Sequence, residues 1–128
     1  MTLNNRSELQ VVTAAQNLCS YTLAATNKSP KSFRFTLVSR LQNLSLSIIE
    51  NIYRANEIFV GFNGTENTQK RLDFQHSALT DVKILAYMAL LAREQGCILP
   101  KQYEQIAKLA YDCQLLLGAW IKNSKKYL

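Results

Sequence analysis

Apolar residues between positions 31 and 60 recur at steps of three or four, which is the spacing of one helical face. A first stripe contains Leu41, Leu44, Ile48, Ile52, Ala55 and Phe59. A second stripe, about a third of a turn away, contains Leu46, Ile49, Tyr53 and Val60. A helix that packs only within its own domain usually has one such stripe, so the second predicts contact with another subunit. A single deep core that buries both stripes is the alternative interpretation.

The same periodicity predicts a helix on either side of this segment. The first begins after Ser7 and ends before Pro30, which cannot continue the backbone hydrogen-bond ladder. Its expected buried face is Val11, Ala15, Leu18, Cys19, Thr22 and Ala25. The next helix begins at Thr65 or Asn67 and ends near Gly96, a residue suited to a left-handed cap. Its run 84–92 is apolar nearly all round, which predicts burial on several sides.

A fourth helix is expected to begin with Pro100, because proline lacks an N–H that the first helical position does not need. Its apolar stripe is Ile106, Leu109, Cys113, Leu116, Leu117 and Trp120. Four helices joined by short connections predict an all-α fold, an up-down-up-down antiparallel four-helix bundle. We expect residues 1–128 to form a single domain, since this length suffices for a substantial core.

The predicted topology separates the charged residues into two groups, one at each end of the bundle. One end has five cations against two carboxylates, namely Lys28, Lys31, Arg34, Arg93 and Lys101 against Glu94 and Glu104. The other has seven against four, namely Arg6, Arg54, Lys70, Arg71, Lys122, Lys125 and Lys126 against Glu8, Glu57, Glu66 and Asp73. Charge alone therefore does not select one end as the binding surface.

Composition points toward polyanionic partners and away from membranes. The net charge of +6 and the pI near 9.4 favour nucleic acid, although a charge that only maintains solubility is the alternative. Cys19, Cys97 and Cys113 form no CxxC pair, which indicates a reducing compartment and no zinc site. The polar N-terminal residues do not resemble a signal sequence. The longest apolar run is far shorter than the roughly 20 residues of a membrane span. We expect a cytoplasmic protein.

We identify no catalytic constellation in the sequence, and we expect neither a metal nor a cofactor. His76 is the only histidine, so no second imidazole exists for a metal pair or a proton relay. Nucleophile motifs, glycine-rich phosphate loops and the Glu-x-x-His pattern of di-metal bundles are absent. The basic residues remain as the functional signal. Lys101 and Lys108 are one heptad apart, and Lys122 extends the same side, which suits binding by charge without reading bases.

Two stretches resemble a known superfamily of four-helix bundles. Residues 30–43 and 47–56 resemble the second helix of this superfamily. Its members include proteins encoded in intervening sequences of bacterial 23S rRNA genes and the accessory variability determinant (Avd) of diversity-generating retroelements. The run from Pro100 to Lys122, with its Leu-Gly-Ala-Trp-Ile-Lys ending, resembles the fourth helix of the Avd branch. The intervening-sequence branch tends to close its second helix with Asn-Ile-Ala-Glu-Gly. The corresponding residues 51–55 here read Asn-Ile-Tyr-Arg-Ala, which favours Avd.

The resemblance implies a non-catalytic pentameric barrel that binds the reverse transcriptase of the retroelement together with RNA and DNA. Such a protein supports the adenine-directed, error-prone copying of a template RNA. A free-standing bundle of the intervening-sequence type is the alternative function. An enzyme whose site forms only between subunits is a third hypothesis. A neighbouring reverse-transcriptase gene with a template and variable repeat pair would distinguish the first two.

Rigid cations lose less entropy on binding than cations on a fraying tail. Lys31, Arg34 and Arg40 lie within the resembling stretch, whereas Lys125 and Lys126 lie near the C-terminus. We therefore expect the nucleic acid and the reverse transcriptase to bind at Lys31, Arg34, Arg40, Lys101, Lys108 and Lys122. We expect the homo-oligomer, a pentamer by resemblance, to form through Leu46, Ile49, Tyr53 and Val60.

Overall fold

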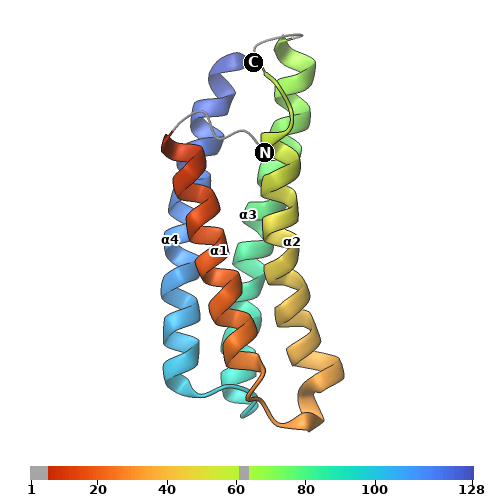
Figure 1. The fold of residues 1–128 in the computed structure, drawn as a ribbon, viewed down its shortest axis with the longest axis vertical. Coiled ribbons are helices and arrows are strands. Elements are labelled where there is room, and N and C mark those ends of the chain that lie inside the picture. The colour runs from red at the N-terminus through yellow and green to blue at the C-terminus, as the bar shows by residue number, and fades with distance from the viewer. Residues whose placement is uncertain (1–5, 61–63) are drawn as a thin grey trace.

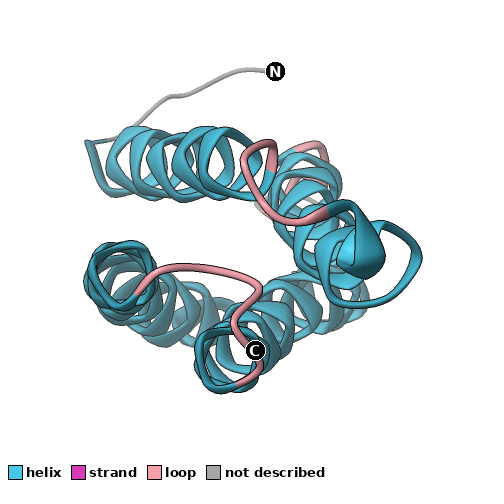
Figure 2. Ribbon diagram, turned by 90° about the horizontal axis from the view of Figure 1, so that it is seen from below, coloured by secondary structure: helices cyan, strands magenta, loops and turns pink. Residues whose placement is uncertain are grey.

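A computed structural model describes residues 6–60 and 64–128, in which four long helices form an antiparallel bundle (Figure 1). The helices are α1 (Arg6–Thr26), α2 (Ser39–Asn56), α3 (Gly64–Glu94) and α4 (Pro100–Ser124). Each helix packs against the next along the chain, and α1 also packs against α4. Figure 2 shows this arrangement from one end. The all-α four-helix bundle predicted from the sequence is confirmed.

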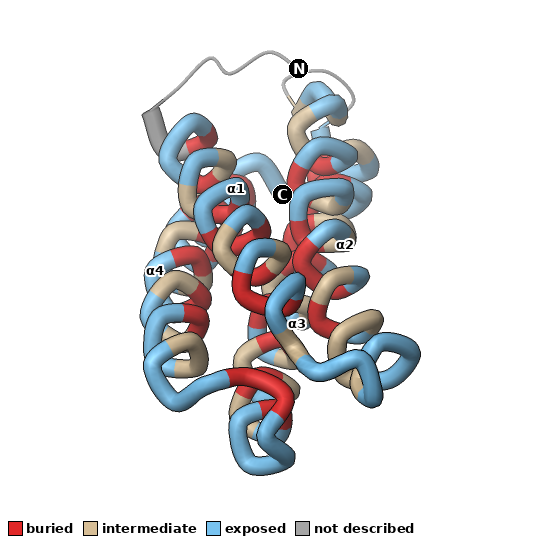
Figure 3. The backbone as a smooth tube through the Cα atoms, turned by 60° about the horizontal axis from the view of Figure 1, so that its bottom comes forward, coloured by how far each residue is buried: buried red, intermediate tan, exposed pale blue. Residues whose placement is uncertain are grey.

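The core is formed by the faces that the periodicity predicted. All six expected residues of α1 are buried, and so are the five α2 stripe residues from Leu41 to Ala55. Ile106, Cys113, Leu117 and Trp120 of α4 complete this core, while Leu109 and Leu116 are half-buried against it. Burial of a large apolar side chain contributes about 1.5–3 kcal/mol, so these inward faces supply most of the driving force. Figure 3 shows the buried positions facing inward on every helix.

The first α2 stripe ends earlier than the sequence predicted. The prediction of a buried Phe59 is wrong, because its side chain is 70% exposed. The helix ends at Asn56, so Phe59, three positions further on, no longer lies on the helical face that covers the core. The Asn67 side chain instead donates a hydrogen bond to the Phe59 carbonyl at 2.9 Å. Val60 also lies beyond the helix and is half-buried.

The segment that leads into α2 is not a regular α-helix. A single 3₁₀ turn, η1 (Lys31–Phe33), is followed by a π-helical turn, η2 (Arg34–Val38). Phe33, Leu37 and Val38 pack against the core, while Phe35 points away from it. A π-helical turn contains more residues than an α-helical turn, so it changes which side chains face inward. Such turns are frequent at functional sites.

The connection between α3 and α4 has the cap that the sequence predicted. Gly96 has a φ of +80°, a left-handed conformation that glycine adopts without strain. The Cys97 N–H donates to the Ala92 carbonyl at 2.8 Å and the Gly96 N–H to the Arg93 carbonyl at 3.1 Å, which is the Schellman pattern. Pro100 is the first residue of α4, as predicted. The Leu99 N–H donates to Gln102 Oε1 at 2.8 Å and helps to anchor that helix start.

The apolar run 84–92 of α3 is buried on fewer sides than expected. Leu85, Ala89 and Ala92 are buried, but Tyr87 and Leu91 are exposed. The inward face of this half of α3 contains Ala78, Val82, Leu85, Ala89 and Ala92. Ile84, Ala86 and Met88 are half-buried against the core beside this face. The outer residues of the run remain in solvent.

Candidate functional site

The stretch between Glu8 and Glu50 carries positive charge but no carboxylate. Residues 9–49 contain four cations and no aspartate or glutamate, and the cations are Lys28, Lys31, Arg34 and Arg40. All four side chains are exposed. They follow one another from the end of α1 through η1 and η2 to the first turn of α2. This segment therefore presents a continuous series of cations without a carboxylate of its own to neutralise them.

A pocket of about 350 Å³ lies at the connection between α1 and α2. We call it the connector pocket, and it is lined by Thr26, Asn27, Ser29, Pro30, Lys31, Arg34, Val38 and Gln42. The Gln42 side chain donates to Thr26 Oγ1 at 2.9 Å, and Thr26 donates to the Thr22 carbonyl at 2.7 Å. The Gln42–Thr26 bond links α2 to α1 at the wall of the pocket, and the Thr26–Thr22 bond fixes the Thr26 hydroxyl within α1. Lysine, arginine, hydroxyl and amide groups at one opening suit an anionic group such as phosphate.

The three cations predicted on α4 do not all lie at the end of the bundle that holds Lys31 and Arg34. Lys101, Lys108 and Lys122 are all exposed on α4. At 1.5 Å per residue, Lys108 lies about 10 Å and Lys122 about 32 Å along the helix from Lys101. α2 and α4 occupy opposite corners of the bundle, since each packs against α1 and α3. Lys101 thus lies at the same end as Lys31 and Arg34, while Lys122 lies at the other end.

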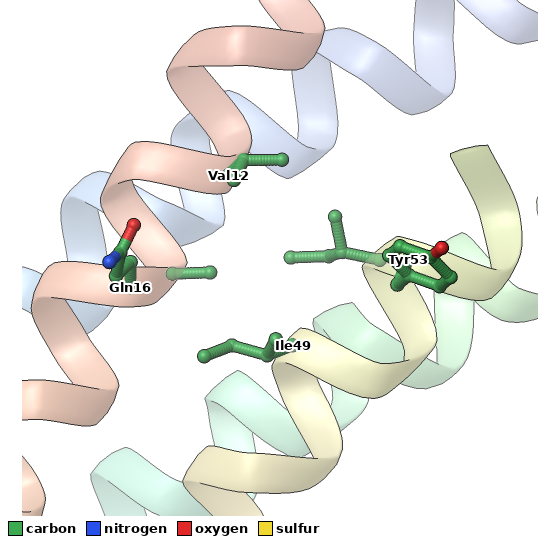
Figure 4. Close-up of a pocket in the computed structure, with 6 residues that line it drawn as sticks. Val12, Gln16, Ile49 and Tyr53 are labelled. Carbon is green, nitrogen blue, oxygen red and sulfur yellow. The ribbon is translucent and has the colours of Figure 1, made fainter. Parts of the chain in front are cut away.

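The second apolar stripe of α2 is only partly covered. Leu46, Ile49 and Tyr53 are 43%, 36% and 48% exposed. Ile49 and Tyr53 border a groove of about 240 Å³ between α1 and α2, whose other lining residues are Val12, Ala15, Gln16 and Ile52 (Figure 4). A hydrogen bond with the Glu57 carboxylate raises the pKa of Tyr53. The stripe and the groove together form an apolar surface, the α1–α2 face, that the chain's own core does not cover.

A second groove flanks the other side of α1. It measures about 460 Å³ and lies between α1 and α4. Its lining residues are Gln10, Thr13, Ala14, Asn17, Leu109, Asp112, Leu115 and Leu116. α1 carries no charged residue between Glu8 and Lys28, so its outer face is neutral along nearly its whole length. The neutral face and the two flanking grooves are consistent with an area that another chain covers.

Sequence reasoning missed a buried ionic cluster at the end of the bundle that holds the start of α1. The sequence places Arg71 among the cations at this end but gives no prediction of its burial, and the structure buries it. Arg71 Nη2 lies 2.6 Å from Glu8 Oε1, and both side chains are about nine-tenths buried. The guanidinium carbon lies 5.1 Å from the centre of the Trp120 ring. Stepping back from Ala78 by three and four residues gives Gln75, Arg71 and Thr68, so the helical period could have placed Arg71 on the buried face.

The possible metal ligands do not gather at one place within residues 6–60 and 64–128. No group of three or more histidine, cysteine or carboxylate side chains there could hold a metal ion. The three cysteines are free and buried, and burial raises the pKa of the Cys113 thiol to about 12. His76 is exposed on α3. Within the same described ranges, no helix is long and apolar enough to cross a membrane.

Comparison with known proteins adds no identification. No family model, no curated protein and no solved structure matches the chain. Two surfaces carry the functional signal. One is the segment with Lys28, Lys31, Arg34 and Arg40, here called the cationic segment, part of which lines the connector pocket. The other is the apolar α1–α2 face.

Proposed function

We propose that this chain is a non-catalytic accessory protein of a diversity-generating retroelement. It binds the retroelement's reverse transcriptase together with RNA and DNA, and it thereby supports mutagenic cDNA synthesis. The observation that carries this proposal is the cationic segment, in which four exposed cations within residues 9–49 face no carboxylate of the same segment. Cations of this kind attract the phosphates of nucleic acid and release counterions on binding.

The proposal includes a homo-oligomer, with a pentamer expected from the resemblance. The exposed Leu46, Ile49 and Tyr53 support self-association, because an apolar patch beside a groove is stabilised when another chain removes it from water. Assembly would also concentrate charge, since each chain contributes a net +6. A multivalent basic surface raises the rate and the strength of polyanion binding.

The first test is the salt dependence of RNA and DNA binding by the wild-type chain. If the four cations of residues 9–49 each contact a phosphate of a single strand, the logarithmic salt slope is about −3 per bound chain. Affinity should then fall about 50-fold between roughly 50 and 200 mM salt. An affinity that stays constant over this range would contradict binding by charge.

The second test asks whether the chain binds the reverse transcriptase directly. Purified reverse transcriptase encoded beside this gene should be retained by the immobilised chain, and heat-unfolded chain serves as the control. A locus that has no reverse-transcriptase gene and no template and variable repeat pair would instead favour the free-standing intervening-sequence type. Retention should survive nuclease treatment if the two proteins contact each other directly.

A further inference from the structure

Phe35 has the most exposed large apolar side chain within residues 6–60 and 64–128, at 86%. It lies in the π-helical turn η2, directly after Arg34. The other apolar side chains of this segment, Phe33, Leu37 and Val38, pack against the core. The irregular turn thus separates Phe35 from its apolar neighbours and directs it to solvent. Because the ring is exposed in the folded chain much as it is in the unfolded one, it gains almost no burial energy on folding and remains available to a ligand.

The surroundings of Phe35 are polar and positively charged. Lys31, Ser32, Arg34 and Thr36 are all exposed, and Arg40 follows in the first turn of α2. Lys31 and Arg34 also line the connector pocket. This differs from the α1–α2 face, where the exposed apolar residues adjoin one another beside an apolar groove. A protein partner's apolar surface would meet one isolated ring and several cations here, which is a poor match.

Single-stranded nucleic acid matches this combination of groups. Proteins that bind it without sequence preference combine cations that contact the backbone with aromatic rings on which bases stack. A duplex does not match, because its bases already stack on each other and leave no free face for the ring. In such a complex the phosphates would contact Lys31 and Arg34, which line the connector pocket, and the adjacent base would cover the ring.

We propose that Phe35 is a base-stacking residue and that the η2 turn preferentially binds unpaired RNA or DNA. The inference rests on the proposed function and refines it, since it names single strands as the preferred ligand and one residue as the source of the preference. Lys31 and Arg34 act as its phosphate contacts, and the connector pocket receives one phosphate group.

The first experiment measures the affinity of Phe35→Ala for a short single-stranded RNA and for a blunt duplex of the same sequence. Loss of one stacked base should weaken single-strand binding about tenfold. Duplex affinity and the salt slope should not change, because no phosphate contact is lost. Phe35→Tyr should retain binding, since it keeps the ring. Phe59→Ala is the matched control, because Phe59 is also exposed, at 70%, but lies at the other end of the bundle.

The second experiment uses fluorescence. Trp120 is the only tryptophan of the chain and is 1% exposed, so its emission should respond little to a ligand at the surface. In Phe35→Trp, titration with the single strand should quench the new exposed emission as a base stacks on the indole. Phe59→Trp should show no such quenching.

The outcomes separate this inference from the proposed function. If wild type binds single strands and Phe35→Ala binds them equally well, Phe35 does not stack and the inference is wrong, while the proposed function stands. If wild type binds no nucleic acid, the nucleic-acid part of the proposed function fails, and the inference fails with it. If Phe35→Ala changes the oligomeric mass in light scattering, the ring is a subunit contact and the inference is wrong.

Discussion

Arg71 and Glu8 form a buried ion pair that crosses the interior of the bundle. The 2.6 Å contact joins α3 to the start of α1, although these helices occupy opposite corners. Trp120 of α4 lies beneath the guanidinium, so three helices meet at one cluster. A buried charge is strongly destabilising once its partner is removed, which makes this cluster a sensitive point of the fold.

Arg71→Met should destabilise the chain by about 3–5 kcal/mol, because it removes the guanidinium from a buried ion pair. The double variant Glu8→Gln with Arg71→Met should recover part of this loss, since no charge is then buried. Urea unfolding monitored by Trp120 fluorescence measures the free energy of unfolding of both variants. Lys70→Met is the matched control, because the neighbouring Lys70–Glu66 pair is exposed and its loss should change stability by less than about 1 kcal/mol. An equal effect of Arg71→Met and Lys70→Met would contradict the structural role of the buried pair.

Two glycines in or beside helices should respond oppositely to alanine. Gly96→Ala should destabilise by about 1 kcal/mol, since alanine resists the left-handed conformation at φ +80°. Gly118→Ala should stabilise by about 0.5–1 kcal/mol, because Gly118 lies within α4 and an added Cβ meets nothing within 4 Å. The free energy of unfolding in urea measures both changes. Changes of the same sign would contradict the assigned backbone conformations.

The Cys113 thiol should be unreactive in the folded chain at neutral pH. Burial raises its pKa from 9.0 to about 12, so almost no thiolate is present to attack an alkylating reagent. Iodoacetamide labelling followed by mass spectrometry should modify Cys113 only after unfolding. The unfolded chain loses this proton near pH 9 and the folded chain near pH 12. The stability gained by keeping the Cys113 thiol protonated is therefore fully present below about pH 9 and declines between about pH 9 and pH 12. Cys113→Ala should show a weaker loss of stability across that alkaline range.

Ile49→Glu should dissociate the proposed oligomer while the chain stays helical, because a charge at a covered apolar interface is unfavourable unless it is paired. Leu91→Glu is the matched control, since Leu91 on α3 is also 36% exposed but lies outside the α1–α2 face. Light scattering gives the mass, and circular dichroism gives the helix content. A wild-type monomer at micromolar concentration would refute the oligomer itself. Equal dissociation by both variants would show that the α1–α2 face is not the specific subunit interface.

Replacement of Arg34 and Arg40 by glutamate should weaken nucleic-acid or reverse-transcriptase binding more than replacement of Lys125 and Lys126. All four residues are exposed, but the first pair lies in the carboxylate-free segment at the start of α2. The second pair lies in the terminal 3₁₀ turn η3 (Lys125–Tyr127). Both double variants change the net charge by the same amount, so bulk electrostatics cancels in the comparison. A binding titration and a pull-down decide it. A larger loss in the Lys125 and Lys126 variant would place the site at the other end of the bundle.

Local rules in the sequence determined the helices and most of their inward faces. The period of 3.6 residues assigned Leu41, Ile48 and Ile52 to the core, and Gly96 and Pro100 marked the ends of two helices. These signals depend on neighbours within a turn or two, so they are readable without tertiary structure. The same period identified the second α2 stripe, whose exposure the structure then showed for Leu46, Ile49 and Tyr53.

Only the tertiary structure decided the features that depend on partners distant in sequence. The sequence places Arg71 among the cations of one end, but its partner Glu8 lies 63 positions away and Trp120 comes from a third helix. Phe59 follows the core stripe in sequence, but α2 ends before reaching it. The connector pocket and the exposed Phe35 both depend on an irregular turn that no short-range pattern specifies. Periodicity tells which side chains share a face, whereas burial and charge pairing depend on what the folded chain places opposite that face.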